Sequence, residues 1–267
     1  MSVCKSLLRA ILAIAALNLF LFTGVAAAGA LDDVKARGKL IAGVRYDSAP
    51  FGYLDASGKV TGFDLDLIND IAKRMGVPIE YVQVTSQNRI PLLLSGKVDV
   101  LAATVTHTRE REKVIDFSID YAWDGTKLLV NKGSGIRSIA DLNHSGKTIT
   151  SNQGALDGPA AIKLAPQAKL VDFPEVQQAY LAVKQGVADA LAVPFSLENQ
   201  YVQKDDSVEI VGDFLTQQAI AFGMRQNDSA WRNAINAYLQ DMVADGTYQA
   251  AYAKYFKGPP PRLPDMW

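Results

Sequence analysis

Cysteine is almost absent from this chain. The only cysteine, Cys4, lies near the N-terminus and ahead of an apolar run, so it is not placed as a lipid-bearing cysteine at a cleavage site. The remainder of the chain can form no disulfide and no cysteine-ligated metal site. This lack does not contradict export, because a chain of 267 residues can rely on a hydrophobic core.

Histidine, excess positive charge and phosphate-binding loops are lacking as well. His107 and His144 are the only histidines, and neither has the spacing of a metal site or a catalytic triad. The formal net charge is −1, so the chain has no basic footprint for nucleic acid. No glycine-rich phosphate loop is present. We therefore expect no catalytic residue, no metal or other cofactor and no nucleic-acid partner.

The first 30 residues form a segment of their own. Lys5 and Arg9 precede the apolar stretch "AILAIAALNLFLFTGVAAAGA", which ends in small residues. This pattern predicts a cleavable secretory signal peptide, residues 1–28, cut near Ala28 or Ala30. A single membrane anchor is the alternative, because the run is nearly long enough to span a bilayer. The small-residue end favours cleavage, and no later run of about 18 apolar residues follows.

Two series of alternating strands and helices make up the rest of the chain. In the first series, β-type runs at 39–44, 78–84 and 98–105 alternate with helical patterns at 64–76 and 89–96. A second series runs from 147 to about 193, and two further helices are expected at 228–244 and 247–256. Such alternation predicts α/β architecture with mainly parallel sheets, arranged as two lobes around a cleft.

Arginines and hydroxyl residues follow the strands of the first series. Because ligands of open α/β sheets bind beyond the carboxyl ends of the strands, these side chains are candidates for a shared site. They are Arg45, then Thr85, Ser86 and Arg89, then Thr104, Thr106, Arg109 and Arg111. Guanidinium groups suit bidentate recognition of carboxylate. Arg89 is the odd member, since a helix start disfavours a cation. The run "TREREK" is also typical of a solvated face, which makes Arg109 a surface residue.

Asp64 and Asp66 allow two interpretations. Paired carboxylates can form a glycosidase or metal site. At the start of a predicted helix, they more simply cap it and complement its dipole.

Two segments resemble a known family. "GFDLDLINDIAKRM" (residues 62–75) fits the signature of the bacterial periplasmic solute-binding proteins for polar amino acids, family 3 of the ABC importers. "TVTHTREREKVIDFSIDY" (residues 104–121) is similar to that family's ligand segment. The resemblance implies the two-lobed periplasmic binding protein fold, with two sheets of parallel type flanked by helices and two hinge strands. We assign lobe 1 to residues 29–126 and 218–267, and lobe 2 to residues 127–217.

The resemblance also implies a function and a site. A monomer closes its cleft on one amino acid and delivers it to the membrane permease of an ABC importer. Arg111 would clamp the ligand α-carboxylate, with Thr104 and Thr106 beside it, and the Thr104 carbonyl and the Thr106 hydroxyl would meet the α-amino group. As in glutamate/aspartate-binding members, Ser86 and Arg89 would hold a side-chain carboxylate, and Arg45 would line that pocket.

The second lobe departs from the family pattern. The loop after its first strand is "NQGALDG", where Asn152, Ala155 and Leu156 would contribute to the site, the last two through backbone N–H groups at a helix start. Members commonly carry an ammonium-binding aspartate after the strand "ADALAV", but here that position is Pro194. Three acids are possible replacements: Asp157, Glu175 and Glu198.

Two other functions remain open from the sequence. Some relatives are dehydratases of cyclohexadienyl acids, in which a cleft carboxylic acid donates the proton, so a catalytic derivative of the fold is the alternative to a binding protein. The chain could also be the sensory module of a signalling receptor, which would require a separate membrane partner.

Overall fold

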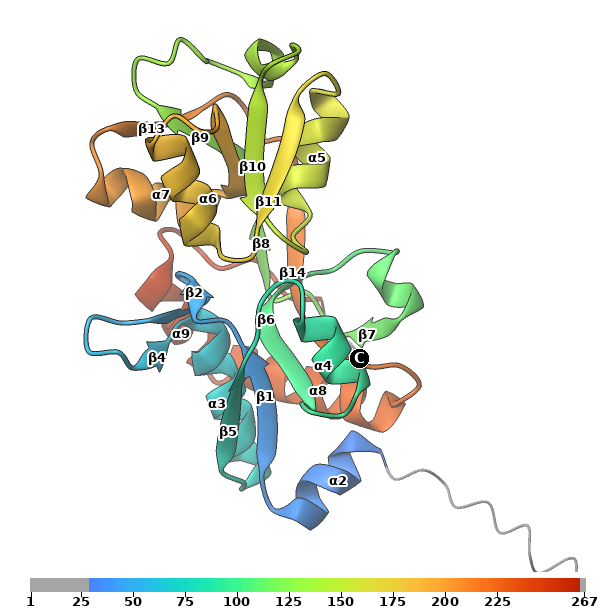
Figure 1. Ribbon diagram of the computed structural model, residues 1–267. Coiled ribbons are helices and arrows are strands. Elements are labelled where there is room, and N and C mark those ends of the chain that lie inside the picture. Colours follow the sequence, from blue (N-terminus) through green and yellow to red (C-terminus); the bar gives the residue numbers. More distant parts are fainter. Residues whose placement is uncertain (1–28, 265–267) are drawn as a thin grey trace, which may run out of the picture.

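Two β-sheets organise the protein, one in each of two lobes (Figure 1). The computed structural model describes residues 29–264, and the expected signal peptide, residues 1–28, lies outside them. From edge to edge, the strands of the first sheet are β5 (Ile79–Gln83), β1 (Leu40–Val44), β6 (Val100–Thr106), β14 (Gln218–Arg225) and β7 (Ile115–Phe117). β8 (Ala122–Asp124) also pairs with β14. The second runs β11 (Lys169–Phe173), β10 (Thr148–Asn152), β12 (Ala190–Pro194), β9 (Thr126–Asn131) and β13 (Val208–Val211). The expected two-lobed α/β fold is confirmed.

Each sheet combines parallel and antiparallel strands. β1 pairs in parallel with β5 and β6, and β10 pairs in parallel with β11 and β12. β14 is antiparallel to β6, β7 and β8, and β9 is antiparallel to β12 and β13. The parallel parts are the α/β series read from the sequence, and the antiparallel strands belong to the segments that pass between the lobes.

Helices cover both faces of the first sheet. α3 (Phe63–Met75), α8 (Ser229–Ala244) and α9 (Thr247–Tyr255) pack together over one face, α4 (Arg89–Leu94) packs on the other, and α2 (Ala30–Arg37) contacts α8. The α3 side holds the larger core, with Phe63 and Trp231 fully buried. The helix expected at 64–76 is confirmed, and Gly76 ends it in a left-handed conformation. The C-terminal helices therefore rejoin the first sheet.

Lobe 2 has the same layered plan. α6 (Val176–Lys184) and α7 (Phe195–Lys204) cover one face of its sheet, while α5 (Asp157–Leu164) and the 3₁₀ helix η2 (Ile139–Leu142) cover the other. α7 was not expected from the sequence. Its buried side chains include the charged Glu198 beside Leu197, so it shows no continuous apolar stripe.

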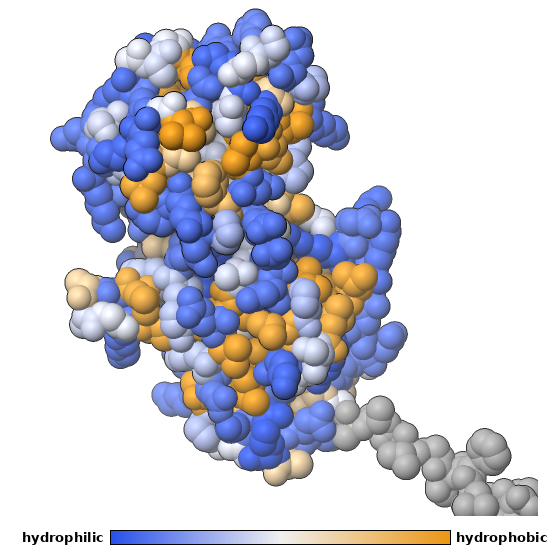
Figure 2. All heavy atoms as spheres, viewed as in Figure 1, coloured by the Kyte–Doolittle hydropathy of each residue, from blue (hydrophilic) through white to orange (hydrophobic). Residues whose placement is uncertain are grey.

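A small sheet extends lobe 1 beside the cleft. It consists of β2 (Asp47–Ser48), β3 (Gly52–Leu54) and β4 (Val60–Thr61), paired antiparallel. This sheet forms from the turn-rich segment after β1, and Figure 1 shows it facing the lower ends of α6 and α7. On the side shown in Figure 2 the surface narrows between the lobes, and hydrophilic residues prevail at this waist.

Two neighbouring crossings join the lobes. One passes from β8 through Gly125 into β9, and the other passes from β13 through residues 212–217 into β14. A Cβ atom on Gly125 would lie 2.4 Å from the Thr216 carbonyl oxygen, so only glycine allows this approach. Thr126 and Thr216 then meet through their hydroxyl oxygens, 2.8 Å apart. In residues 29–264 no helix is both long and apolar enough to cross a bilayer.

Candidate functional site

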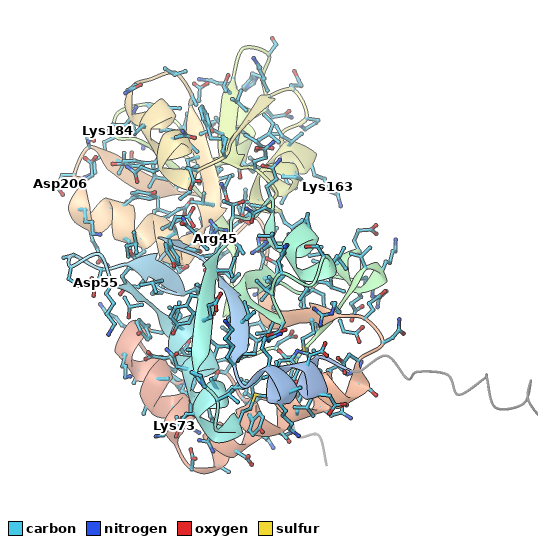
Figure 3. All side chains as sticks on the ribbon, turned by 60° about the horizontal axis from the view of Figure 1, so that its bottom comes forward. Arg45, Asp55, Lys73, Lys163, Lys184 and Asp206 are labelled. Atoms are coloured by element: carbon cyan, nitrogen blue, oxygen red, sulfur yellow. The ribbon has the colours of Figure 1, made fainter. Side chains whose placement is uncertain are left out.

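The carboxyl ends of the strands in both lobes converge on one cavity between the sheets. Figure 3 shows Arg45, one of its residues, lying between the two lobes. Of the nine residues expected from the sequence, eight line this cavity: Arg45, Ser86, Arg89, Thr104, Thr106, Asn152, Ala155 and Leu156. The ninth, Arg111, does not line it but contacts residues at its edge, as described below. Several lining residues were not anticipated: Ser48, Asp124, Val176, Val193, Leu197, Gln218 and Ile220.

Arg45 already has several partners. Its Nε donates to Asp47 Oδ1 at 2.6 Å, and its Nη1 donates to the Ser86 hydroxyl. Its Nη2 reaches across the cleft to Asn152 Oδ1, at 3.4 Å. Arg45 therefore links the two walls of the cavity, and its charge is paired with the Asp47 carboxylate.

Arg89 is buried with no counter-ion. Only 2% of its surface is exposed, and Nη1 donates to the carbonyl oxygens of Ala103 at 2.6 Å and Thr104 at 3.0 Å. Its Nε has no hydrogen-bond partner, and no carboxylate among residues 29–264 forms an ion pair with it. Burial, followed by the nearby charges of Arg111 and Arg45, holds the pKa of Arg89 well below its usual range. An anion in the cavity would compensate this charge.

Arg111 stands at the start of the 3₁₀ helix η1 (Arg111–Lys113). Its Nη1 donates to the Thr106 carbonyl oxygen at 2.8 Å, and its Nη2 donates to the Gly154 carbonyl oxygen of lobe 2 at 3.3 Å. Burial lowers the pKa of Arg111, and the charge of Asp157 acts in the opposite direction. Arg111 and Asp157 therefore interact across the cleft.

Thr104 is held in an uncommon backbone conformation. Its φ is 52°, a left-handed value that is unusual for a threonine. Asp64 Oδ2 accepts a hydrogen bond from the Thr104 N–H at 2.7 Å, and Asp64 Oδ1 accepts one from the Tyr121 hydroxyl at 2.7 Å. Burial raises the pKa of Asp64 to about 6. The capping role expected for Asp64 is wrong, since Gly62 is the N-cap of α3 and the Asp64 carboxyl instead fixes the Thr104 backbone.

Lobe 2 contributes polar groups of a different kind. The Ala155 N–H donates to the Asn152 carbonyl oxygen at 3.0 Å, so the local turn uses this donor. Asn152 in turn donates its side-chain amide to the Pro174 carbonyl oxygen at 2.9 Å. These bonds fix the loop after β10 and place Leu156 and Asp157 at the start of α5.

The three acids considered as replacements at Pro194 occupy different places. Asp157 lines the cavity, and its Oδ1 accepts hydrogen bonds from Thr126 Oγ1 at 2.6 Å and Gln218 Nε2 at 3.1 Å. Glu198 is fully buried without a hydrogen-bond partner for either oxygen, but it does not line the cavity. Glu175 caps α6 at the rim of the cleft. Burial raises the pKa of all three carboxyl groups.

Asp124 is a further acid of the cavity. Its Oδ1 accepts from the Gly125 N–H at 2.8 Å, and its Oδ2 accepts from the Ser196 hydroxyl. Burial raises its pKa to about 6. In the described part of the chain, no group of three or more His, Cys, Asp or Glu side chains is arranged to hold a metal ion.

Comparison with known proteins identifies the family. A profile of the bacterial extracellular solute-binding proteins, family 3, matches residues 40–258. The chain belongs to this family. The profile covers both α/β series, so the expectation drawn from residues 62–75 and 104–121 is confirmed.

Family 3 relatives are similar over most of this chain. The glutamine-binding protein GlnH of Bacillus subtilis is 32% identical over 231 residues, which cover 85% of this chain and 84% of the relative. The glutamate/aspartate import solute-binding protein of Escherichia coli K12 is 30% identical over 256 residues, which cover 90% and 84%. A solved ancestral amino-acid-binding protein, described as a precursor of cyclohexadienyl dehydratase, has a TM-score of 0.80 at 36% identity and covers 85% of this chain and 99% of its own. A mutant of the arginine-binding protein from T. maritima has a TM-score of 0.81 at 32% identity, covering 86% and 100%. Because these names include neutral, acidic and cationic ligands, the ligand must be argued from this chain's own cavity.

Proposed function

We propose that this family 3 protein is the substrate-binding component of an ABC importer and binds an acidic or polar amino acid, with glutamate or aspartate favoured. Family membership and the names of the relatives support an amino-acid ligand and a membrane permease as partner. The N-terminal pattern supports export to the periplasm. Residues 29–126 with 218–267 form lobe 1, residues 127–217 form lobe 2, and a monomer closes the two on its ligand.

The observation that carries the acidic preference is the charge balance around Arg89. Arg45 and Arg89 line the lobe 1 side of the cavity, with Arg111 at its edge, and among residues 29–264 Arg45 alone of the three has an ion-pair partner. A buried guanidinium without a counter-ion is costly, so a ligand carboxylate at Arg89 replaces a missing interaction. Guanidinium groups also match the planar geometry of a carboxylate.

Each expected residue has a role in this proposal. Arg111, with Thr104 and Thr106, holds the α-carboxylate, whereas Ser86 and Arg89 hold the side-chain carboxylate. Arg45 borders the second site and links it to lobe 2 through Asn152. Ala155 and Leu156 close the cavity from the lobe 2 side.

A thermal-melting panel of the twenty amino acids and of simple dicarboxylates tests the proposal. At a ligand concentration about 100-fold above Kd, mass action stabilises the folded protein by about 2.7 kcal/mol, which is a measurable shift. We expect the largest shift with glutamate or aspartate. A larger shift with glutamine or arginine would contradict the acidic preference alone, whereas no shift with any amino acid would contradict the binding function.

A catalytic derivative of the cyclohexadienyl dehydratase type is the second candidate. One observation favours it: Asp124 lines the cavity and burial raises its pKa to about 6, as a proton donor requires. Incubation with prephenate or arogenate, followed by detection of an aromatic product, separates the two functions. We expect no turnover, because both Asp124 oxygens are engaged by Gly125 and Ser196.

A further inference from the structure

The cavity is lined by acidic side chains, and these have no part in binding the carboxylates of a ligand. A zwitterionic amino acid brings an ammonium group as well as its carboxylates, and a buried cation needs an anionic acceptor. Among residues 29–264, two acidic side chains line the cavity, Asp124 and Asp157. Either of them can serve as the anionic acceptor for the ammonium group of an amino acid.

The hydrogen bonds of the two acids distinguish them. Asp124 uses both carboxylate oxygens, since Oδ1 accepts from Gly125 and Oδ2 accepts from Ser196. In Asp157, the bonds from Thr126 and Gln218 both go to Oδ1. Among residues 29–264, no other side chain donates to its Oδ2. Asp157 thus keeps an oxygen that no side chain in the described part of the protein uses, beside a cavity that the residue lines.

The charges around the cavity also favour Asp157 as the acceptor of the ammonium group. The charge of Asp157 acts on both Arg111 and Arg89 from the opposite wall. In an α-amino acid the ammonium group is attached to the carbon that bears the α-carboxylate. If Arg111 holds the α-carboxylate, the ammonium group lies two bonds from the carboxylate carbon, and Asp157 is the acid whose charge acts on Arg111.

A hydrogen-bond relay fixes the Asp157 carboxylate. Thr106 Oγ1 of lobe 1 donates to Gln218 Oε1 at 2.8 Å, and Gln218 Nε2 donates to Asp157 Oδ1 of lobe 2 at 3.1 Å. Gln218 begins β14, the strand that enters lobe 1 from the second crossing. The amide thereby links both walls of the cavity, and Gln218 is a positioning residue for Asp157.

We propose that Asp157 accepts the ammonium group of the ligand and makes the cavity selective for α-amino acids over the dicarboxylates that lack an amino group. This inference rests on the proposed amino-acid function. Asp157, at the start of α5, would then bind the ammonium group, which Pro194 cannot do because proline carries no charge. A dicarboxylate without an amino group would instead face the Asp157 carboxylate with no cation between them.

Calorimetry with glutamate and glutarate tests this assignment, because the two differ only by the amino group. We expect the wild-type protein to prefer glutamate, and Asp157→Asn to lose at least about 30-fold in glutamate affinity, as removal of one partner of a buried charge pair does. Glutarate affinity should stay unchanged or rise, so the glutamate-to-glutarate ratio collapses. Asparagine keeps an acceptor oxygen for Thr126 and Gln218, and Asp157→Ser is the second variant should the first fail to fold.

Glu198→Gln is the matched control, because it also removes a buried carboxyl of lobe 2 but does not line the cavity. It should keep the wild-type ratio. A ratio that changes less than about threefold in both Asp157 variants would overturn the inference while leaving the amino-acid function intact. If the wild-type protein binds neither glutamate nor any other amino acid, the proposed function itself fails. If the melting panel favours glutamine, the pair becomes glutamine and glutaramic acid, with the same expected outcomes.

Discussion

The two walls of the cleft share a strand plan but carry opposite charge. In lobe 1, arginines follow β1, β5 and β6, whereas in lobe 2 the segment after β10 brings Asp157 to the cavity, and α7, after β12, buries Glu198 away from its lining. The same backbone geometry thus presents cations on one side and a carboxylate on the other. A ligand that matches both walls has anionic groups toward lobe 1 and a cationic group toward lobe 2, which is the charge pattern of an acidic amino acid.

The walls also differ in how their buried charges are compensated. Within residues 29–264, Arg45 has Asp47 as a partner, whereas Arg89 has carbonyl oxygens alone and Glu198 has no hydrogen-bond partner. Uncompensated buried charges cost stability, and perturbed pKa values of this kind cluster at functional sites. Burial lowers the pKa of Arg89 and raises the pKa of Glu198, so it disfavours the charged form of one buried side chain in each lobe.

Removal of Arg111 should have the largest effect on the cationic wall. Since Arg111→Ala deletes the expected α-carboxylate clamp, we expect at least about a 30-fold loss of affinity for every ligand that binds the wild-type protein. Calorimetry gives the affinity, and melting of the unliganded protein confirms the fold. Arg109→Ala is the control, because Arg109 belongs to the same charge run but is exposed. Equal effects of the two substitutions would disprove the clamp.

Replacement of Arg89 should separate ligand selectivity from stability. We expect Arg89→Met to reduce glutamate affinity at least about tenfold and to change glutamine affinity less than threefold, because one charge-assisted hydrogen-bond partner is lost. The unliganded variant should melt at the wild-type temperature or above, since a buried cation without a counter-ion is removed. Arg45→Met is the comparison, and it should destabilise the unliganded protein by leaving Asp47 unpaired. A stability loss in Arg89→Met with unchanged selectivity would assign Arg89 a purely structural role.

Sequence reasoning anticipated the cationic wall far better than the anionic one. Arg45, Arg89 and the threonines of β6 follow strands with clear apolar patterns, so their place at the sheet edge could be inferred. Asp157 begins a helix, where an acidic residue is common. Its hydrogen bonds come from Thr126, which is 31 residues away in the sequence, and from Gln218, which is 61 residues away. Such long-range contacts leave no local pattern. The same holds for the Asp64–Thr104 bond, which local reasoning mistook for a helix cap.

Asp64 should give lobe 1 a measurable pH dependence. Its pKa in the folded protein is about 6, above the model-peptide value of 3.8, so the folded state binds a proton more tightly than the unfolded state. This group therefore stabilises the fold increasingly as pH falls from about 6 to about 4, at about 1.4 kcal/mol per unit of pKa shift as an upper limit. Asp64→Asn should flatten the dependence of the unliganded melting temperature on pH between 7 and 4. Asp33→Asn, an exposed control in α2, should keep the wild-type slope. An unchanged slope in Asp64→Asn would show that Asp64 titrates normally.

The rim of the cleft reverses the charge contrast of its interior. Here lobe 1 presents Asp47, the partner of Arg45, and lobe 2 presents Glu175 at the start of α6. Burial and then the Asp47 charge raise the pKa of Glu175, while Arg45 acts in the opposite direction. Tyr201 also faces Asp47 from α7. Two carboxylates of like charge thus face each other across the rim, and protonation of Glu175 relieves the repulsion.

Glu175→Gln should therefore produce a small gain in affinity. Because the pair is near the surface, we expect at most about a fivefold increase for the preferred ligand at pH 8, shrinking as pH falls and the wild-type carboxyl takes up its proton. Glutamine keeps an oxygen that can accept the cap hydrogen bond from Gln178, so α6 should be preserved. Glu209→Gln is the control, since Glu209 belongs to lobe 2 but pairs with Arg137 away from the cleft. A gain that is equal at pH 5 and pH 8 would exclude repulsion at the rim, because only the ionised Glu175 opposes closure.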